Sequence, residues 1–185
     1  MNLVEYKKTI KHPVRVCTET FLLKGEDVCL GLKKRGFGKG NYLGIGGKVE
    51  EDKDRKEISE DNLAVAKNAA CREIQEEIDV IVYPKDLLFM GIFKFYFPHI
   101  TDESWNQQVY VFTANKWQGE PVARADEAGQ IEIEPEWVNK INIPFDKMWD
   151  DAHYWLLEVL DGKKLDGEFV FGERLKVMDY FICCR

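Results

Sequence analysis

The chain lacks the features that mark several specialised classes of protein. No apolar run reaches the roughly 18 residues of a membrane span, and the N-terminus has no apolar signal core. No basic stripe runs through the sequence, and the net charge is -7 at pH 7. Because phosphate-backbone affinity needs lysine and arginine clusters, polymeric nucleic acid is not an expected partner. We therefore expect neither a membrane nor a nucleic-acid polymer as partner. A small anion is still possible as a ligand.

Paired cysteines and clustered histidines are also missing. The five cysteines are an odd number, and no Cys-x-x-Cys occurs. Neither a disulfide framework nor a zinc site is indicated, and a reducing cytoplasm is the expected location. His12, His99 and His153 are scattered along the chain and are not expected to bind metal.

What is present is the composition of a folded protein. The 185 residues are 45% hydrophobic and 32% charged, enough for one domain with a sizeable core. We expect a single domain over 1–185 that behaves as a monomer. Residues 1–12 read as a polar tail or short edge element, and residues 51–61 as an exposed, charged insertion.

Hydrophobic patterning and turn signals divide the chain into alternating elements. The expected strands span 14–23, 28–32, 42–49, 87–97, 107–113, 169–171 and 177–182. One expected helix begins at Asn62, with Asp61 or Asn62 as N-cap. A second helix is expected over 152–160, where Asp150 and Asp151 could cap the start. The first two strands, and the pair 87–97 and 107–113, are predicted to form hairpins.

The helix around 69–78 carries the strongest chemical signal. Glu73, Glu76 and Glu77 stand at i, i+3 and i+4, so their side chains share an arc of about 100°. Three carboxylates this close repel one another, and a divalent cation would relieve the repulsion. Oxygen ligands in this number suit Mg²⁺, with Mn²⁺ possible. The alternative is a solvated acidic face.

Two glycine-rich stretches precede this helix. Residues 33–40 combine four cations with three glycines, which favours either a solvated loop or a flexible rim that attracts a polyphosphate. Phe37 in that loop is predicted to cap an aromatic pocket. Gly46 and Gly47 interrupt the next short strand and let its backbone approach a ligand, a metal or the following helix.

Together these stretches resemble a known family. Residues 46–50, followed by Arg72-Glu-Ile-Gln-Glu-Glu77, are similar to the Nudix box, G-x5-E-x7-R-E-U-x-E-E-x-G-U. The basic loop 33–40, the stretch 143–155 and a closing Met-Asp-Tyr extend the similarity over about 14–181. The chain looks like a MutT-type Nudix hydrolase of the branch that hydrolyses 8-oxo-dGTP.

The resemblance implies a fold and an activity. The fold is of the α/β class, an α/β/α sandwich around a mixed β-sheet. The activity is Mg²⁺-dependent hydrolysis of a purine (d)NTP, such as 8-oxo-dGTP, to the monophosphate and pyrophosphate, which sanitises the nucleotide pool. A Nudix hydrolase for another nucleotide, or a non-catalytic nucleotide-binding module, is the alternative.

The resemblance also implies roles for individual residues. Glu73, Glu76 and Glu77 would bind the metal together with the Gly47 carbonyl. One of these carboxylates or a later glutamate would orient the attacking water. Glu132 matches the spacing of that later glutamate to a Pro and a Trp, and Glu127 is the other candidate. Arg72 would pair within the box and, with Gly46, has a structural role.

The implied substrate pocket spans distant parts of the chain. Its positions are matched here by Thr18, Lys33, Phe37, Leu43, Phe95, Phe97, Gln107, Trp149 and Asp151. Trp149 would stack on or wall the base, Asp151 would bond its edge, and Lys33 would lie near the phosphates.

Several positions depart from the family pattern. Leu43 replaces an Asn that reads the base edge, and Gln107 replaces a Met. Counted back from Arg72, the first glutamate of the box falls at Ala64, and its glycine after E-E-x is Asp79. For the missing glutamate, substitutes could come from Glu50, Glu57 or Glu60.

Overall fold

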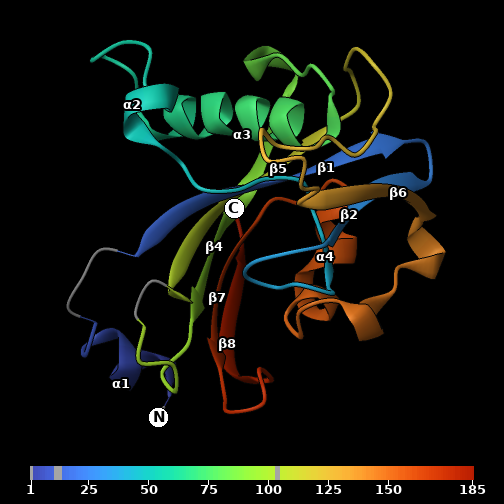
Figure 1. Ribbon diagram of the computed structural model, residues 1–185. Helices are drawn as coiled ribbons and strands as arrows, with labels where there is room; N and C mark the ends of the chain where they lie inside the picture. The colour runs from blue at the N-terminus through green and yellow to red at the C-terminus, as the bar shows by residue number, and fades with distance from the viewer. Residues whose placement is uncertain (1, 11–13, 103–104) are drawn as a thin grey trace.

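A mixed β-sheet forms the centre of the protein in the computed structural model, which describes residues 2–10, 14–102 and 105–185 (Figure 1). Within them, the sheet has eight strands: seven run in the order β3-β2-β1-β5-β4-β7-β8, and β6 pairs with β2. The strands are β1 Arg15–Lys24, β2 Asp27–Lys33, β3 Tyr42–Leu43, β4 Leu88–Tyr96, β5 Gln107–Ala114, β6 Ile133–Asn139, β7 Leu165–Phe171 and β8 Val177–Cys184. β1 runs parallel to β5 and β4 parallel to β7, whereas the other pairs are antiparallel.

The register of the central strands brings distant residues side by side. Arg15 of β1 lies opposite Gln107 of β5, which in turn lies opposite Phe95 of β4. The expected hairpins β1–β2 and β4–β5 are both confirmed as antiparallel pairs. One end of the sheet therefore joins a cation, an amide and an aromatic ring.

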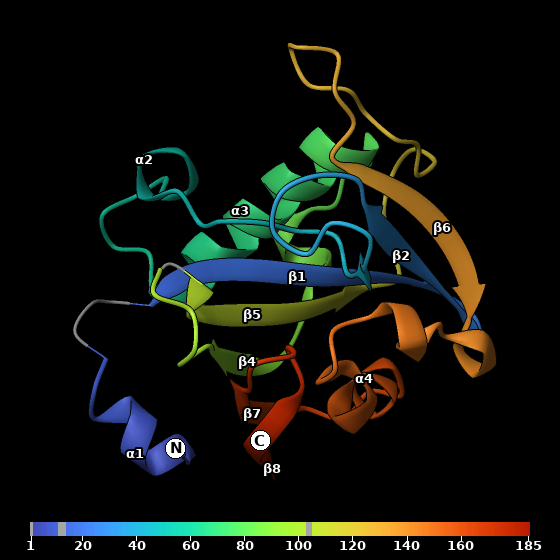
Figure 2. The same ribbon diagram turned by 60° about the horizontal axis from the view of Figure 1, so that its bottom comes forward.

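Helices cover both faces of the sheet (Figures 1 and 2). The helices are α1 Leu3–Lys7, α2 Glu51–Asp54, α3 Asn62–Ile78 and α4 Ala152–Leu160, with 3₁₀ turns η1 Pro84–Asp86, η3 Lys140–Asn142 and η4 Phe145–Lys147. Helix α3 lies on one face and α4 on the other, which confirms the expected sandwich. In the described part of the chain, no helix is long and apolar enough to cross a membrane.

Local sequence explains both ends of α3. The Asp61 side chain accepts a hydrogen bond from the Ala64 amide at 2.8 Å, so Asp61 is the predicted N-cap. Ala70, Ile74 and Ile78 are fully buried against the sheet. At the other end Asp79 has φ 56°, a left-handed conformation that favours glycine. Asp79 thus takes the backbone shape of the glycine that it replaces.

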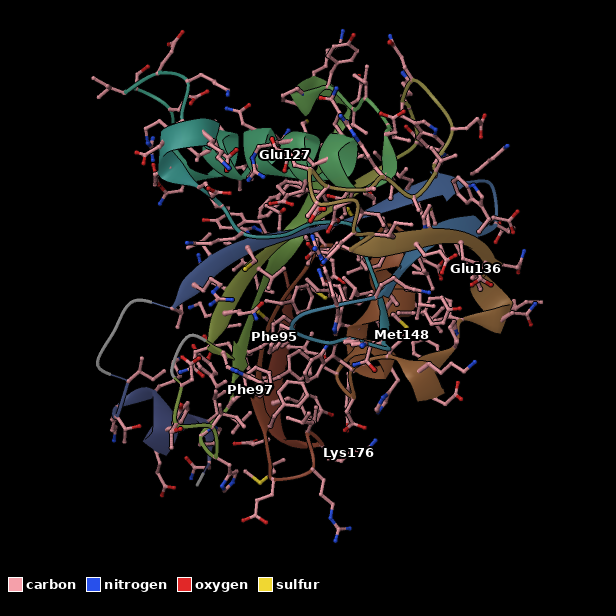
Figure 3. All side chains as sticks on the ribbon, viewed as in Figure 1. Phe95, Phe97, Glu127, Glu136, Met148 and Lys176 are labelled. Atoms are coloured by element: carbon pink, nitrogen blue, oxygen red, sulfur yellow. The ribbon has the colours of Figure 1, made fainter. Side chains whose placement is uncertain are left out.

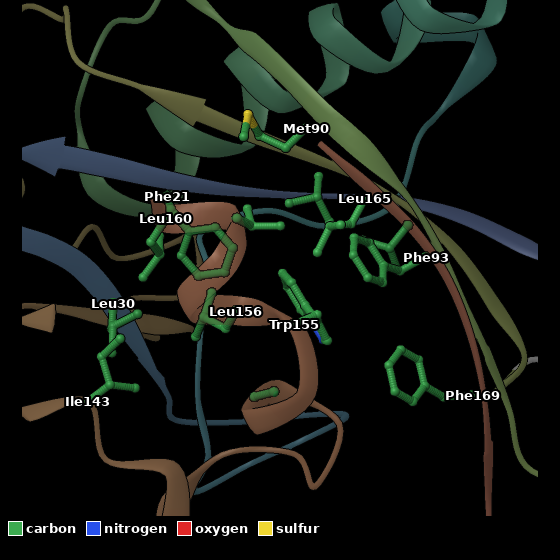
Figure 4. Close-up of a cluster of buried hydrophobic side chains, with 14 of the residues drawn as sticks. Phe21, Leu30, Met90, Phe93, Ile143, Trp155, Leu156, Leu160, Leu165 and Phe169 are labelled. Atoms are coloured by element: carbon green, nitrogen blue, oxygen red, sulfur yellow. The ribbon is translucent and has the colours of Figure 1, made fainter. Parts of the chain in front are cut away.

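Helix α4 completes the core on its side of the sheet. Trp155 and Leu156 pack with Phe21, Phe93 and Phe169 (Figure 4). Burial of side chains of this size contributes about 1.5–3 kcal/mol each. This helix is therefore held mainly by its apolar face.

The predicted caps of α4 are wrong in detail. Asp151 occupies the N-cap position, but its side chain makes no capping bond. It accepts a hydrogen bond from Trp155 Nε1 at 2.7 Å instead, and Asp150 accepts from the Val177 amide at 2.8 Å. Asp150 therefore serves a tertiary contact with β8, and Asp151 bonds to a side chain of its own helix.

The segment expected as a tail contains a packed helix. Asn2 and Glu5 form a capping box at the start of α1. Leu3 and Tyr6 are buried in a small cluster with Tyr96 and Val170. The expectation of a polar tail or short edge element is therefore wrong over 2–10, where the chain forms a packed helix. Residues 1, 11 and 12, His12 included, lie outside the described residues.

The charged insertion is also less exposed than expected. Ile58 is 99% exposed, as an exposed loop requires. Asp54, at the end of α2, is only 1% exposed. The insertion thus sends one acidic side chain into the protein, toward α3.

Candidate active site

A cavity of about 370 Å³ lies beside the central strands. All nine residues predicted for the substrate pocket line it: Thr18, Lys33, Phe37, Leu43, Phe95, Phe97, Gln107, Trp149 and Asp151. Gly46, Gly47 and Glu132 line it as well. The size is that of a small-molecule site. The structure therefore joins residues from across the chain into one pocket, as expected.

Aromatic rings enclose one end of the cavity. Phe37 stacks on Trp149, with ring centroids 5.0 Å apart and an interplanar angle of 16°, so the predicted aromatic cap is present. Phe97 stacks on Phe171 at 4.8 Å. Phe95, near the end of β4, is half-buried, and Phe97, which follows β4, is buried (Figure 3). Flat walls of this kind suit a flat ring. We call this the base end.

Two acids also face the base end. Glu19 of β1 lines the cavity, and its Oε1 accepts a hydrogen bond from the Gly44 amide at 2.7 Å. Burial raises the pKa of Glu19 to about 7. Burial likewise raises the pKa of Asp151 to about 6, although the hydrogen bond from Trp155 opposes the shift. Both carboxyls are therefore poised to change protonation near neutral pH.

Sequence reasoning missed Glu19. The only signal was a glutamate inside an otherwise apolar strand, between Thr18 and Thr20. Leu43 lines the cavity while packing against the cluster on the α3 side. The Thr18 hydroxyl is buried and has no hydrogen-bond partner among the described residues. The polar groups of the base end thus differ from those expected.

The other end of the cavity, the phosphate end, meets helix α3. Glu77 is 7% exposed, and its Oε2 accepts a hydrogen bond from the Gly46 amide at 3.1 Å. Lys33 Nζ lies 3.8 Å from Glu77 Oε1 and 2.5 Å from Glu132 Oε1. Burial raises the pKa of Glu77 to about 8; Lys33 opposes this, and Glu73 and Glu132 add to it. The carboxyl is thus short of positive charge.

The paired glycines let the backbone meet this helix. A Cβ on Gly47 would stand 2.7 Å from the carboxyl carbon of Glu73, and one on Gly46 would stand 2.2 Å from the Thr18 carbonyl oxygen. Either methyl would push the strand away from its neighbour. The predicted close approach is confirmed, and the partners are the helix and strand β1.

The three glutamates of α3 are not equivalent. Neither Glu73 nor Glu77 lines the cavity, but their charges interact with each other and with Glu132, which does line it. Glu76 is 55% exposed and accepts from Arg72 at 3.1 Å. In the part of the chain that the structure describes, no three Asp, Glu, His or Cys side chains form a metal-holding group.

The donor set nevertheless fits a hard divalent cation. Glu73 and Glu77 supply two buried carboxyls whose pKa values burial raises, as expected for acids that lack a full complement of positive charge. The Gly47 carbonyl accepts a hydrogen bond from the Thr18 amide at 2.8 Å and retains a second lone pair. Glu76 would supply a third carboxylate to such a cation only after breaking its contact with Arg72.

Arg72 holds this end together, as predicted. Its Nε and Nη2 donate to the two oxygens of Asp54, at 2.8 and 3.0 Å. Nη1 donates to Glu73 at 2.8 Å, and Nη2 also donates to the Lys48 carbonyl. A bidentate guanidinium of this kind orients what it touches. Arg72 therefore ties α2 and the glycine strand to Glu73.

The substitute for the missing glutamate of the box is Asp54. The predicted substitutes Glu50, Glu57 and Glu60 do not pair with Arg72 in the described structure. The Glu50 amide instead donates to Asp54 at 2.7 Å. Counted forward from Gly47, the box glutamate falls at Lys53, the neighbour of Asp54. That forward count falls one residue before Asp54, because the extra residues follow this position.

The two candidates for the later glutamate are separated by the fold. Glu132 lines the cavity and binds Lys33 and Arg35. Burial acts to raise the pKa of Glu132, but these two cations outweigh it and the pKa lies below its usual value. Glu127 is exposed and does not line the cavity. Glu132 is the better placed of the two.

Two curated proteins are similar to this chain in sequence over most of its length. No protein-family model matches the chain. The "oxidized purine nucleoside triphosphate hydrolase" of Mus musculus is 33% identical over 169 residues, covering 90% of this chain and 92% of the mouse protein. The protein of the same name from Danio rerio is 33% identical over 157 residues, covering 85% and 86%. The chain belongs to the Nudix hydrolase family.

The fold of this Nudix hydrolase is shared with more distant members. A MutT protein from Bacillus halodurans superposes with a TM-score of 0.65 at 20% identity, covering 91% of this chain and 97% of that one. A MutT Nudix hydrolase from Burkholderia pseudomallei gives 0.54 at 20% identity, covering 72% and 88%. At such identities the likeness concerns the fold, which is the expected α/β architecture.

Proposed function

We propose that this Nudix hydrolase cleaves an oxidised purine nucleoside triphosphate to the monophosphate and pyrophosphate. The observation that carries the proposal is a single cavity with two unlike ends. Aromatic rings with acidic groups form one end, and Lys33, Lys48 and Glu132 form the other, where Lys33 lies 3.8 Å from Glu77 of α3. The names of the mouse and zebrafish relatives support the same substrate class. Such a reaction removes damaged nucleotides from the pool.

The phosphate end would hold Mg²⁺ through Glu73, Glu77 and the Gly47 carbonyl. A bound divalent cation neutralises phosphate charge and lowers the pKa of water. Lys33 and Lys48 line the cavity here and can attract the triphosphate. Arg72 fixes the rotamer of Glu73 through their 2.8 Å contact.

Glu132 would orient or deprotonate the attacking water. Because its pKa lies below the usual value, it is ionised at neutral pH and can accept a hydrogen bond from water. Glu76, which is 55% exposed and pairs with Arg72, would add a carboxylate to the metal only in the loaded enzyme. Gly46 has a structural role in this scheme, because its backbone amide donates a hydrogen bond to Glu77.

The base end would take the purine between aromatic walls. Phe95, Phe97 and Trp149 line it, and Asp151 and Gln107 add polar atoms. Base–aromatic stacking contributes about 1–3 kcal/mol. We propose 8-oxo-dGTP as the leading substrate. That the enzyme is a monomer of the cytoplasm stays a prediction.

A substrate panel with Mg²⁺ tests the function. Pyrophosphate release is measured for 8-oxo-dGTP, 2-oxo-dATP and the four unmodified dNTPs, with chelator as control. We expect monophosphate and pyrophosphate as products, and kcat/KM for an oxidised purine at least about tenfold above that for its parent. Activity should disappear with chelator.

A second candidate is hydrolysis of another nucleotide, which Leu43 favours because it offers no hydrogen bond at the position of the pocket Asn. Preference for an unmodified nucleotide in the same panel would support it and overturn the first proposal. Binding of nucleotides without any turnover would contradict both and leave a binding module.

A further inference from the structure

Glu19 is a cavity acid that the mechanism above does not use. Side chains alternate along β1, so Cys17, Glu19 and Phe21 share one face. Cys17 and Phe21 belong to the core cluster on the α4 side, and all three residues line the cavity. Glu19 therefore faces the base end from the sheet, while Asp151 reaches it from the segment before α4.

The neighbouring strand is shaped to receive this side chain. The Gly44 amide donates to Glu19 Oε1 at 2.7 Å. A Cβ on Gly44 would stand 2.6 Å from Glu19 Cγ and 3.0 Å from the Phe21 ring. Any larger residue at 44 would displace the carboxylate. The position of Glu19 is thus built by two features of one glycine, its amide and its missing side chain.

Glu19 retains unused hydrogen-bonding capacity. Among the described residues no lysine or arginine pairs with it, and the Gly44 amide supplies its hydrogen bond. A carboxylate has about four acceptor sites, so several stay free. Burial and the charge of Asp151 both disfavour the ionised form. A ligand that brings N–H donors would therefore be bound strongly.

The other side chains of this end are less suited to this contact. Leu43 has no polar atom, and Asp151 already has two donors, the Trp155 indole at 2.7 Å and its own backbone amide, against one for Glu19. Gln107 is an amide, which forms weaker hydrogen bonds than a carboxylate. Glu19 is the acid best suited to accept from two adjacent N–H groups on a ring edge. A guanine-type base offers such a pair, its ring N1–H and exocyclic amine.

We propose that Glu19 is a specificity-determining residue whose carboxylate accepts hydrogen bonds from adjacent N–H groups of a guanine-type purine. This rests on the proposed function and deepens it by naming the base edge. An adenine-type base presents a ring nitrogen acceptor beside its amine. One carboxylate oxygen of Glu19 would then face another acceptor, which is unfavourable. Sites that bond a polar edge reject analogues that lack it.

The test uses Glu19→Leu and Glu19→Gln. Leu removes both oxygens, whereas Gln keeps the shape but presents a donor beside an acceptor. The matched control is Glu158→Gln, an exposed glutamate of α4 that pairs only with Lys163. Calorimetry without metal measures binding of 8-oxo-dGMP, dGMP and dAMP, and kinetics measures kcat and KM for the triphosphates.

We expect Glu19→Leu to weaken binding of guanine-type monophosphates about 10- to 100-fold while changing dAMP binding less than about threefold. Glu19→Gln should reduce the ratio of the affinity for dGMP to that for dAMP, and Glu158→Gln should leave this ratio unchanged. Losses should appear in KM, with kcat nearly constant. Equal losses for all bases, or none, would overturn the proposal.

The two proposals fail in distinguishable ways. If the unmodified protein hydrolyses no purine triphosphate, the proposed function fails, while the binding data still judge Glu19. If it hydrolyses them and the Glu19 variants keep the parental base preference, only the Glu19 proposal fails. Should Glu19→Leu not fold, Glu19→Gln still decides by its preference.

Discussion

The acids at the two ends of the cavity have different kinds of hydrogen-bond partner. At the phosphate end, acids meet cations: Asp54 and Glu73 bind Arg72, and Glu132 binds Lys33. At the base end, Glu19 and Asp151 meet only neutral donors, the Gly44 amide and the Trp155 indole. Acids at the phosphate end thus have cationic partners before any ligand binds, although Glu77 is only weakly compensated by Lys33 at 3.8 Å, whereas among the described residues the acids at the base end have no cationic partner.

The difference separates two tasks. Paired charges hold carboxylates in one orientation, which suits groups that must hold a metal or a water. Acids with neutral partners stay sensitive to the ligand, because each hydrogen bond that a base donates changes their ionisation. The pKa of Asp54 lies below its usual value, whereas that of Glu19 is raised to about 7. Chemistry and recognition thus have separate electrostatics within one cavity.

Glu77→Gln tests the phosphate end most severely. The amide keeps the size of the side chain and can still accept from the Gly46 amide, but it cannot carry the charge that a divalent cation needs. We expect kcat to fall about 10²- to 10³-fold, with a melting temperature within a few degrees of the parent. Steady-state kinetics with saturating Mg²⁺ measures it. A kcat within threefold of the parent would remove Glu77 from the metal site.

Asp54→Asn asks whether charge compensation matters at that end. Arg72 would lose its bidentate partner, and Glu73 would lose the anchor that holds Arg72. Hydrogen bonds to charged groups contribute about 1.5–3 kcal/mol, so unfolding in urea should show a loss of about 2 kcal/mol. Activity should fall about 10- to 100-fold. Glu51→Gln, an exposed pair with Arg55, is the control and should change neither.

Acid should erase this stability difference. Burial acts to raise the pKa of Asp54, but the hydrogen bonds from Arg72 and the Glu50 amide outweigh it. A lowered folded-state pKa gives stability at neutral pH that is lost as pH falls through that pKa. The parent should therefore approach Asp54→Asn below about pH 4, the range in which an unfolded Asp protonates. A constant gap from pH 7 to pH 3 would argue against the ion pair.

Much of the fold follows from local signals. Helix α3 begins one residue after its Asp61 cap, and α4 spans the predicted 152–160, because capping and apolar periodicity act within a few residues. The cavity residues could be predicted because separate motifs resemble one family. Their placement on β1, β4, β5 and the segment before α4 then confirmed one pocket.

The misses share a physical cause, which is burial decided by tertiary contact. Nothing in a run of charges shows that Asp54 alone turns inward, because its partner Arg72 is 18 residues away. Glu19 is held by the amide of Gly44, which lies 25 residues further on. Helix α1 is only five residues long, and its packing depends on the distant Tyr96 and Val170.

Trp149→Ala tests the base end by removing a wall and leaving every charge in place. Phe37, which stacks on Trp149, would lose its support as well, so the purine would lose much of its enclosure. Stacking on an aromatic ring is worth about 1–3 kcal/mol, and we expect KM to rise about tenfold while kcat changes less than threefold.

Trp117→Ala is the matched control, because Trp117 stacks on Trp137 at 5.9 Å and packs in the cluster on the α3 side, away from the cavity. It should lower the melting temperature and leave KM unchanged. If Trp149→Ala lowered kcat as strongly as Asp54→Asn does, the two ends would not be independent, and the division between orienting charges and a recognising pocket would have to be abandoned.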